Sequence, residues 1–180
     1  MLMRPQQSGF TMIEVLVTIA ILVVGLLGLA AMQTLSTLAE LESYQRSQAL
    51  VLLRDMSDRM TANKAQIVNY VTVGDLGLTT QNCAPLLAAP DYQLDKCEWN
   101  NQLNGAAEKS NAGTKNVGAM IGARGCIVRL DGTTFLVTIA WQGLSRAGIP
   151  KEACGANAYG DDENRRTVST IVRIALLNAI

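Results

Sequence analysis

The amino-acid sequence predicts an α+β fold in which a long N-terminal helix packs on a C-terminal antiparallel β-sheet. Two observations lead to this fold class. Residues 10–64 contain no proline, and Gly25 and Gly28 are their only glycines, so little in this stretch would break a helix. Runs rich in β-branched and aromatic residues follow after residue 125, and Asp131-Gly132 forms a hairpin turn signal between the first two.

The first half of the predicted helix is apolar enough to cross a membrane. Residues 15–32 carry no charge. At ~1.5 Å per residue they cover about 27 Å, close to the roughly 30 Å of a bilayer hydrocarbon core. Arg4 precedes this run, and Glu40 and Glu42 are the first charges after it. Because positive residues stay on the cytoplasmic side, we expect the C-terminal bulk of the chain to be exported.

The residues at the start of this run form a recognisable motif. Gly9-Phe10-Thr11-Met12-Ile13-Glu14 resembles the processing site of type IV pilins and of the related pseudopilins of type II secretion. The resemblance implies that residues 1–9 are a prepilin leader, that prepilin peptidase cuts between Gly9 and Phe10, and that the new Phe10 amine is methylated. It also implies a role in subunit assembly for Glu14. A carboxylate in an apolar helix is expensive, and the Phe10 amine of its own or an adjacent subunit is the expected partner.

Two alternatives concern this helix. A secretory signal peptide would end in a small-residue cleavage site, and Gly28-Leu29-Ala30 offers one. Glu14 interrupts the early apolar region, and the helical pattern continues past Ala30, so we expect residues 10–33 to remain as the transmembrane and assembly half of the helix. The second alternative is a pair of helices with a hinge near Thr34.

The second half of the helix, residues 34–64, shows an amphipathic pattern that suits the cover of a sheet. Its inner positions recur at spacings of three and four: Leu35, Leu38, Leu41 or Glu42, Leu50, Leu53, Met56 and Met60. The charged residues are expected mostly on the other face: Arg46, Arg54, Asp55, Asp58 and Arg59. We expect residues 34–180 to form one periplasmic globular domain that includes this half of the helix.

Residues 65–125 look rich in loops. Gly74-Asp75-Leu76-Gly77, Ala89-Pro90-Asp91 and Asn104-Gly105 have turn chemistry. Leu94 and Trp99 are candidates to cover the edge of a core. The stretch from Gly105 to Gly125 is rich in Ala, Gly, Asn and Lys, which favours a mobile or partly helical connection.

The four cysteines, Cys83, Cys97, Cys126 and Cys154, all follow the membrane segment. An even number of cysteines in an exported domain predicts disulfides. A zinc site is one alternative to disulfides, but no cysteine pair has Cys-x-x-Cys spacing and the chain has no histidine. Free buried thiols are the other alternative. Pairing each cysteine with its nearest neighbour favours Cys83–Cys97 with Cys126–Cys154, and closing a loop of roughly 15 residues is worth about 3 kcal/mol.

Three strands are predicted in the C-terminal part. They comprise residues 126–130, residues 135–141 and residues 167–176. Phe135, Val137, Ile139 and Trp141 alternate along the second strand and therefore share one face. An antiparallel sheet of this kind keeps one apolar face, and the long helix is the element available to cover it.

Composition and motifs argue against catalysis and nucleic-acid binding. The absence of histidine removes histidine-based triads, metal ligands and general bases. Lys+Arg and Asp+Glu number 15 each, so the chain lacks the basic excess typical of nucleic-acid binding. Gly74-x-x-Gly77 lacks the Lys-Ser/Thr ending of a phosphate loop. The acidic run 161–163 beside Arg165-Arg166 lacks the spaced ligands of a calcium loop and predicts a solvated turn. We expect no enzyme activity, catalytic residue, cofactor or metal.

The resemblance extends to the C-terminal strands, which look like those of minor type IV pilins. It implies a structural subunit that enters a type IV pilus or primes its assembly, with a part in twitching motility and cell adhesion. The implied partners are other minor and major pilins, prepilin peptidase and the inner-membrane assembly platform. The implied location is the inner membrane, as a single-pass protein with its C-terminal domain in the periplasm, and then the pilus. A minor pseudopilin of a type II secretion system is the alternative, and an enzyme anchored by one helix is a distant third.

Overall fold

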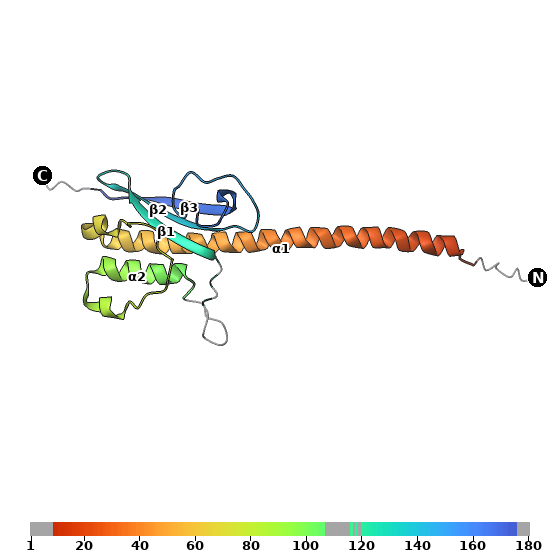
Figure 1. Ribbon diagram of the computed structural model, residues 1–180, viewed down its shortest axis with the longest axis horizontal. Helices are drawn as coiled ribbons and strands as arrows, with labels where there is room; N and C mark the ends of the chain where they lie inside the picture. The colour runs from red at the N-terminus through yellow and green to blue at the C-terminus, as the bar shows by residue number, and fades with distance from the viewer. Residues whose placement is uncertain (1–8, 107–115, 117, 119, 176–180) are drawn as a thin grey trace, which may run out of the picture. The chain divides into compact units, whose positions relative to one another are not determined.

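The computed structural model describes residues 9–106, 116, 118 and 120–175. Its elements follow one another as α1 (Met12–Ala62), the short 3-10 helices η1 (Lys64–Tyr70) and η2 (Ala84–Ala88), α2 (Asp91–Leu103), β1 (Ile121–Arg129), β2 (Thr134–Gln142), the 3-10 turn η3 (Asp162–Asn164) and β3 (Arg165–Arg173). A long N-terminal helix and an antiparallel three-stranded sheet confirm the predicted α+β class (Figure 1). The chain divides between Leu41 and Glu42 into two units, which are described separately.

The N-terminal unit is the apolar part of α1. The helix runs without interruption for 51 residues, so the alternative of two helices with a hinge near Thr34 is wrong. In the described part of the chain, α1 is the one helix long and apolar enough to cross a membrane. Its most apolar stretch buries nothing within the chain itself, as expected of a surface made to face lipid or other helices.

The C-terminal part of α1 belongs to the globular unit and buries a narrower stripe than the sequence predicts. Its buried residues are Gln45, Ala49, Leu53, Met56 and Met60. Leu50 is 47% exposed, and Leu35, Leu38 and Leu41 of the N-terminal unit are also exposed, so their assignment to the covering stripe is wrong. The buried positions follow one another at intervals of four and three, which places Ala49 rather than the larger Leu50 on the inner face.

The sequence does not predict helix α2, because the apolar pattern of this segment is weak. The helix has 13 residues, of which four are buried: Cys97, Trp99, Asn100 and Leu103. Its composition is polar on average. Trp99 is fully buried, and its indole N–H donates to the Leu52 carbonyl of α1 at 3.0 Å, so it joins two helices rather than covering an edge. The expected flexible connection from Gly105 to Gly125 is partly wrong, since β1 begins at Ile121; residues 107–115, 117 and 119 of that stretch lie outside the described residues.

The sheet has the order β1-β2-β3, with both pairs antiparallel (Figure 1). All three strands begin earlier than predicted, and β3 ends at Arg173, before residues 174 and 175 of the predicted third strand. Leu176 lies outside the described residues. Asp131 shapes the β1–β2 turn, since its carboxylate accepts hydrogen bonds from the backbone N–H groups of Thr133 and Thr134, both at 2.8 Å. Hydrogen bonds in both directions between Leu76 and Gly125 place the segment that follows η1 along the free edge of β1.

Both faces of β2 are covered, although the sequence predicted one apolar face. Phe135, Val137, Ile139 and Trp141 lie in the main core with the inner stripe of α1, with Trp99 and with Leu103. On the other face, Ala140 packs in a second cluster with Cys126, Cys154 and the partly buried Tyr159. The second cluster exists because the loop between β2 and β3 folds back over the sheet, where the disulfide Cys126–Cys154 holds it.

Candidate processing and assembly site

The motif residues lie at the start of α1. Gly9, Phe10 and Thr11 precede the helix, and the Thr11 carbonyl accepts the N–H groups of Glu14 and Val15 at 3.1 and 3.3 Å. The Gly9–Phe10 peptide bond therefore lies in non-helical backbone just before the first turn, where both residues are exposed. A peptidase can reach a bond in such backbone without unwinding the helix. Residues 1–8 of the predicted leader lie outside the described residues.

Gly9 is not required by the fold of the described chain. A Cβ atom at this position would meet nothing within 4 Å, and its φ is not in the left-handed region. Neither packing nor backbone strain therefore explains glycine here. A small residue at this position would allow a peptidase to approach the Gly9–Phe10 bond closely, as the resemblance to the processing motif implies.

Glu14 lies in the first turn of α1, and its side chain is exposed. The unpaired N–H groups of a helix N-terminus carry partial positive charge, which favours a carboxylate at this position. In the uncut chain the Phe10 nitrogen is a neutral amide, so the ion pair expected from the sequence requires cleavage first. Phe10 itself is 83% exposed, and together with the apolar side chains that follow it forms an uncovered surface.

The globular unit is closed by two disulfides, Cys83–Cys97 and Cys126–Cys154. These are the pairs favoured by nearest-neighbour reasoning. The first attaches the segment before η2 to α2, and the second attaches β1 to the loop before β3. The Asp75 carboxylate lies close to the sulfurs of Cys126 and Cys154, but sulfurs bonded to each other have no thiolate to offer a metal ion.

The comparisons with known proteins match two consecutive parts of the chain. Residues 4–30 match the family model of the prokaryotic N-terminal methylation motif, and residues 31–100 match that of type IV pilin Tt1218. These matches support an assignment of the chain to the type IV pilin superfamily. They support a pilin or pseudopilin subunit of a family of structural proteins, with processing by prepilin peptidase and assembly with other pilins. Neither the curated proteins nor the solved structures contain a match to the chain.

Arg165 anchors the outer layer of the globular unit, a role that the sequence did not reveal. Arg165 lies beside the predicted solvated turn at residues 161–163, yet it is only 2% exposed. Its guanidinium binds both carboxylate oxygens of Asp162, at 3.0 and 2.7 Å, and donates to the carbonyls of Pro150, Glu152 and Cys154. A run of charged residues gave no sign that one of them would be enclosed by backbone carbonyls.

Polar contacts also hold the C-terminal part of α1 to the rest of the globular unit. Arg59, expected on the outer face, pairs with Asp95 and Glu98 of α2 at 2.9 and 2.6 Å. Glu42 accepts hydrogen bonds from the backbone N–H groups of Leu144 and Ser145 and lies 3.3 Å from the Arg166 guanidinium. The Ser145 hydroxyl and this guanidinium hold the pKa of Glu42 below its ordinary value, against the opposing effect of burial.

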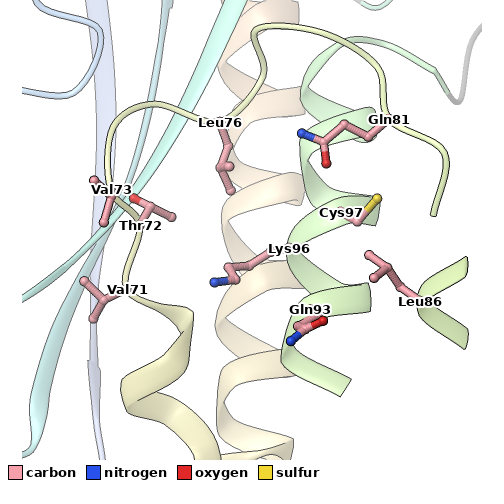
Figure 2. A pocket seen from close by; sticks show the side chains of 9 residues that line it. All are labelled: Val71, Thr72, Val73, Leu76, Gln81, Leu86, Gln93, Lys96 and Cys97. Atoms are coloured by element: carbon pink, nitrogen blue, oxygen red, sulfur yellow. The ribbon is translucent and has the colours of Figure 1, made fainter. Parts of the chain in front are cut away.

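A pocket of about 380 Å³ opens between α2 and the segment that follows η1; it is called the α2 pocket below (Figure 2). Its apolar lining is Val71, Val73, Leu76 and Leu86. Its other lining residues are Thr72, Gln81, Gln93, Lys96 and Cys97. In Figure 2, Lys96 extends from α2 toward the segment 71–73, while Leu76 and Leu86 approach from different sides.

Proposed function

We propose that the chain is a minor type IV pilin that enters the pilus or primes its assembly, with a part in twitching motility and cell adhesion. The observation that carries the proposal is the position of the motif. Gly9 through Glu14 sit at the start of a 51-residue helix whose apolar first half is uncovered, and a disulfide-closed domain follows. This arrangement suits a subunit whose helix is held first by lipid and then by other subunits.

The proposed division of the chain follows from this proposed transfer from the membrane to the pilus. Residues 1–9 are the leader that prepilin peptidase removes, and residues 10–33 form the transmembrane and assembly half of the helix. Residues 34–180 form the periplasmic domain of a single-pass inner-membrane protein. The inner-membrane assembly platform then transfers the subunit into the pilus, where it contacts other minor and major pilins.

The narrower assignment rests on the strands. Residues 125–129, residues 137–143 and the final strand that ends at Arg173-Ile174 resemble the minor pilin PilV, the type IV pilus modification protein. In the structure these residues fall on β1, β2 and β3 and on their immediate ends. The resemblance favours a pilus over the pseudopilus of a type II secretion system.

Deletion of the gene tests the proposal. Loss of surface pili and twitching, with secretion of exported enzymes unchanged, is the expected result. Mass spectrometry of sheared pili should then detect this subunit in small amounts relative to the major pilin. Normal piliation together with loss of exported enzymes would replace the proposal with the pseudopilin alternative.

A further inference from the structure

Lys96 brings a positive charge into the α2 pocket. Its ammonium group donates to the Asn69 carbonyl at 2.8 Å and lies 5.2 Å from the centre of the Tyr92 ring. Among the described residues, no carboxylate oxygen lies within the 4.0 Å of an ion pair, whereas Arg59 and Arg165 face carboxylates at 2.6–3.0 Å. An ammonium group has three N–H donors, so Lys96 retains donor capacity for a ligand.

The surroundings of Lys96 are apolar. Leu76 and Leu86 both contribute to the lining, and the side chain of Val73 at the pocket is fully exposed. Leu87, next in sequence to Leu86, is 74% exposed. A small inorganic anion would leave these side chains in water. A longer apolar segment that carries one carboxylate would cover them and supply the missing charge.

The walls of the pocket are fixed before any partner arrives. On one side, Thr72 and Leu76 donate their backbone N–H groups to carbonyls of β1 at 3.0 and 2.9 Å. On the other side, the disulfide Cys83–Cys97 and the pair of Arg59 with Asp95 hold α2. A partner therefore does not have to order these walls when it binds, which lowers the entropic cost of association.

We propose that the α2 pocket receives an acidic, apolar segment of another pilin subunit, whose carboxylate pairs with Lys96 while its apolar side chains pack on Leu76 and Leu86. The proposal rests on the function proposed above and deepens it, because it identifies a contact surface of the globular domain in addition to the helix. The chemistry is that of a Glu or Asp flanked by Val or Leu residues.

Peptide binding to the processed full-length chain in neutral detergent micelles tests the proposal. The probes are fluorescent, end-capped Gly-Ser-Leu-Val-X-Val-Leu-Ser peptides in which X is Glu, Gln or Lys, and binding is followed by anisotropy. The Glu peptide should bind about tenfold more tightly than the other two, since a hydrogen bond to a charged group contributes about one tenfold step in affinity or more. Lys96→Gln should remove this preference, and Lys96→Glu should transfer it to the Lys peptide. Lys151→Gln is the matched control at an exposed lysine outside the pocket.

Reversal of the preference by Lys96→Glu separates binding from mere loss of structure, because a damaged fold would weaken all three peptides alike. Equal affinities for the three peptides, or no binding of any, would overturn the proposal. So would Lys96-dependent binding to vesicles that contain phosphatidylglycerol, if the Glu peptide does not compete with them. Piliation of the gene-deleted strain is read independently, so the proposed function can stand when the pocket proposal fails.

Discussion

At the scale of single residues, Arg165 shows how one buried charge organises a loop. It joins the start of β3 to the carbonyls of Pro150, Glu152 and Cys154, and the Asp162 carboxylate balances its charge. Breaking a buried ion pair by removing one partner is costly, since the remaining charge is left without compensation. The fold of the outer layer should therefore depend on the ionisation of Asp162.

The first prediction is a pH dependence carried by this pair. The Arg165 guanidinium holds the pKa of Asp162 below its ordinary value. Because the pKa in the folded state lies below the unfolded value of about 3.9, the stabilisation is present above that pH and is lost as the pH falls through the folded-state pKa. Asp162→Asn should lower Tm near neutral pH and flatten the fall of Tm in acid. Thermal melts of the oxidised domain without residues 1–33 measure both effects.

Asp161→Asn is the control for this pair. Among the described residues, the Asp161 carboxylate pairs only with the exposed guanidinium of Arg146, at 3.3 Å, so its replacement should leave the pH profile close to that of the parent. Identical acid profiles for the parent and for Asp162→Asn would mean that the pair does not govern acid stability.

Gly125 is a second decisive residue, because the backbone of β1 approaches the ring of Trp99 closely. A Cβ atom at Gly125 would lie 2.4 Å from a ring carbon of Trp99 and 2.6 Å from a methyl carbon of Leu103, both in the buried core. Gly125→Ala should therefore destabilise the domain by about 1–3 kcal/mol through overpacking. Gly148→Ala, where a Cβ would meet nothing within 4 Å, should change stability by less than about 0.5 kcal/mol. Urea unfolding of the two variants gives the comparison, and equal midpoints would contradict the close approach.

At the scale of elements, α1 carries two surfaces with different purposes. Its first half presents apolar side chains all round, and its second half buries one stripe. Leu50 and Leu53 lie three residues apart in the second half, yet they are 47% and 4% exposed. The same helix therefore offers a matched pair of leucines for a test of its inner face.

The prediction for this element compares Leu53→Ala with Leu50→Ala. Removing the buried side chain should cost about 2–5 kcal/mol, because it leaves a cavity beneath the sheet. Removing the half-exposed side chain should cost less than about 1 kcal/mol. Both variants are made in the oxidised domain without residues 1–33 and unfolded in urea. Similar losses at the two positions would show that the helix is rotated from the orientation described here.

At the scale of the whole molecule, the proposed maturation separates two steps that two variants can distinguish. The first variant tests processing. Gly9→Val should leave a full-length precursor in the membrane, because a β-branched side chain next to the scissile bond keeps the peptidase away while the fold loses no contact. Intact mass measurement of the membrane fraction checks this, with the parent beginning at a methylated Phe10. A mature parent chain that begins at any other residue would refute the processing proposal.

The second variant tests assembly. Glu14→Ala should still be cut and inserted, since the substitution removes a charge from the apolar helix, but it should enter filaments poorly. The reason is the proposed pairing of the Glu14 carboxylate with a Phe10 amine in a medium of low dielectric constant, which would set the register between subunits. The ratio of mature subunit in sheared pili to that in membranes is the measurement. Equal ratios for the variant and the parent would remove the assembly role from Glu14.

Features that depend on neighbouring residues could be predicted from the amino-acid sequence. The absence of breakers set one helix over most of residues 10–64, and the uncharged run within it predicted the possible membrane span. The alternating residues of β2 and the Asp131-Gly132 turn predicted a hairpin that the structure contains. The processing motif could also be identified from consecutive residues alone, because such a motif is a short stretch of chain.

Features that depend on residues far apart in the sequence could not be predicted in this way. Contacts across the fold determine which face of α1 is buried and why the polar segment α2 is helical. They also enclose Arg165. Lys96 is likewise an ordinary helical lysine in the sequence, and only the packing of α2 against the segment after η1 places it in a pocket. Such contacts are set by the competition of many side chains for one core, which local propensity does not contain.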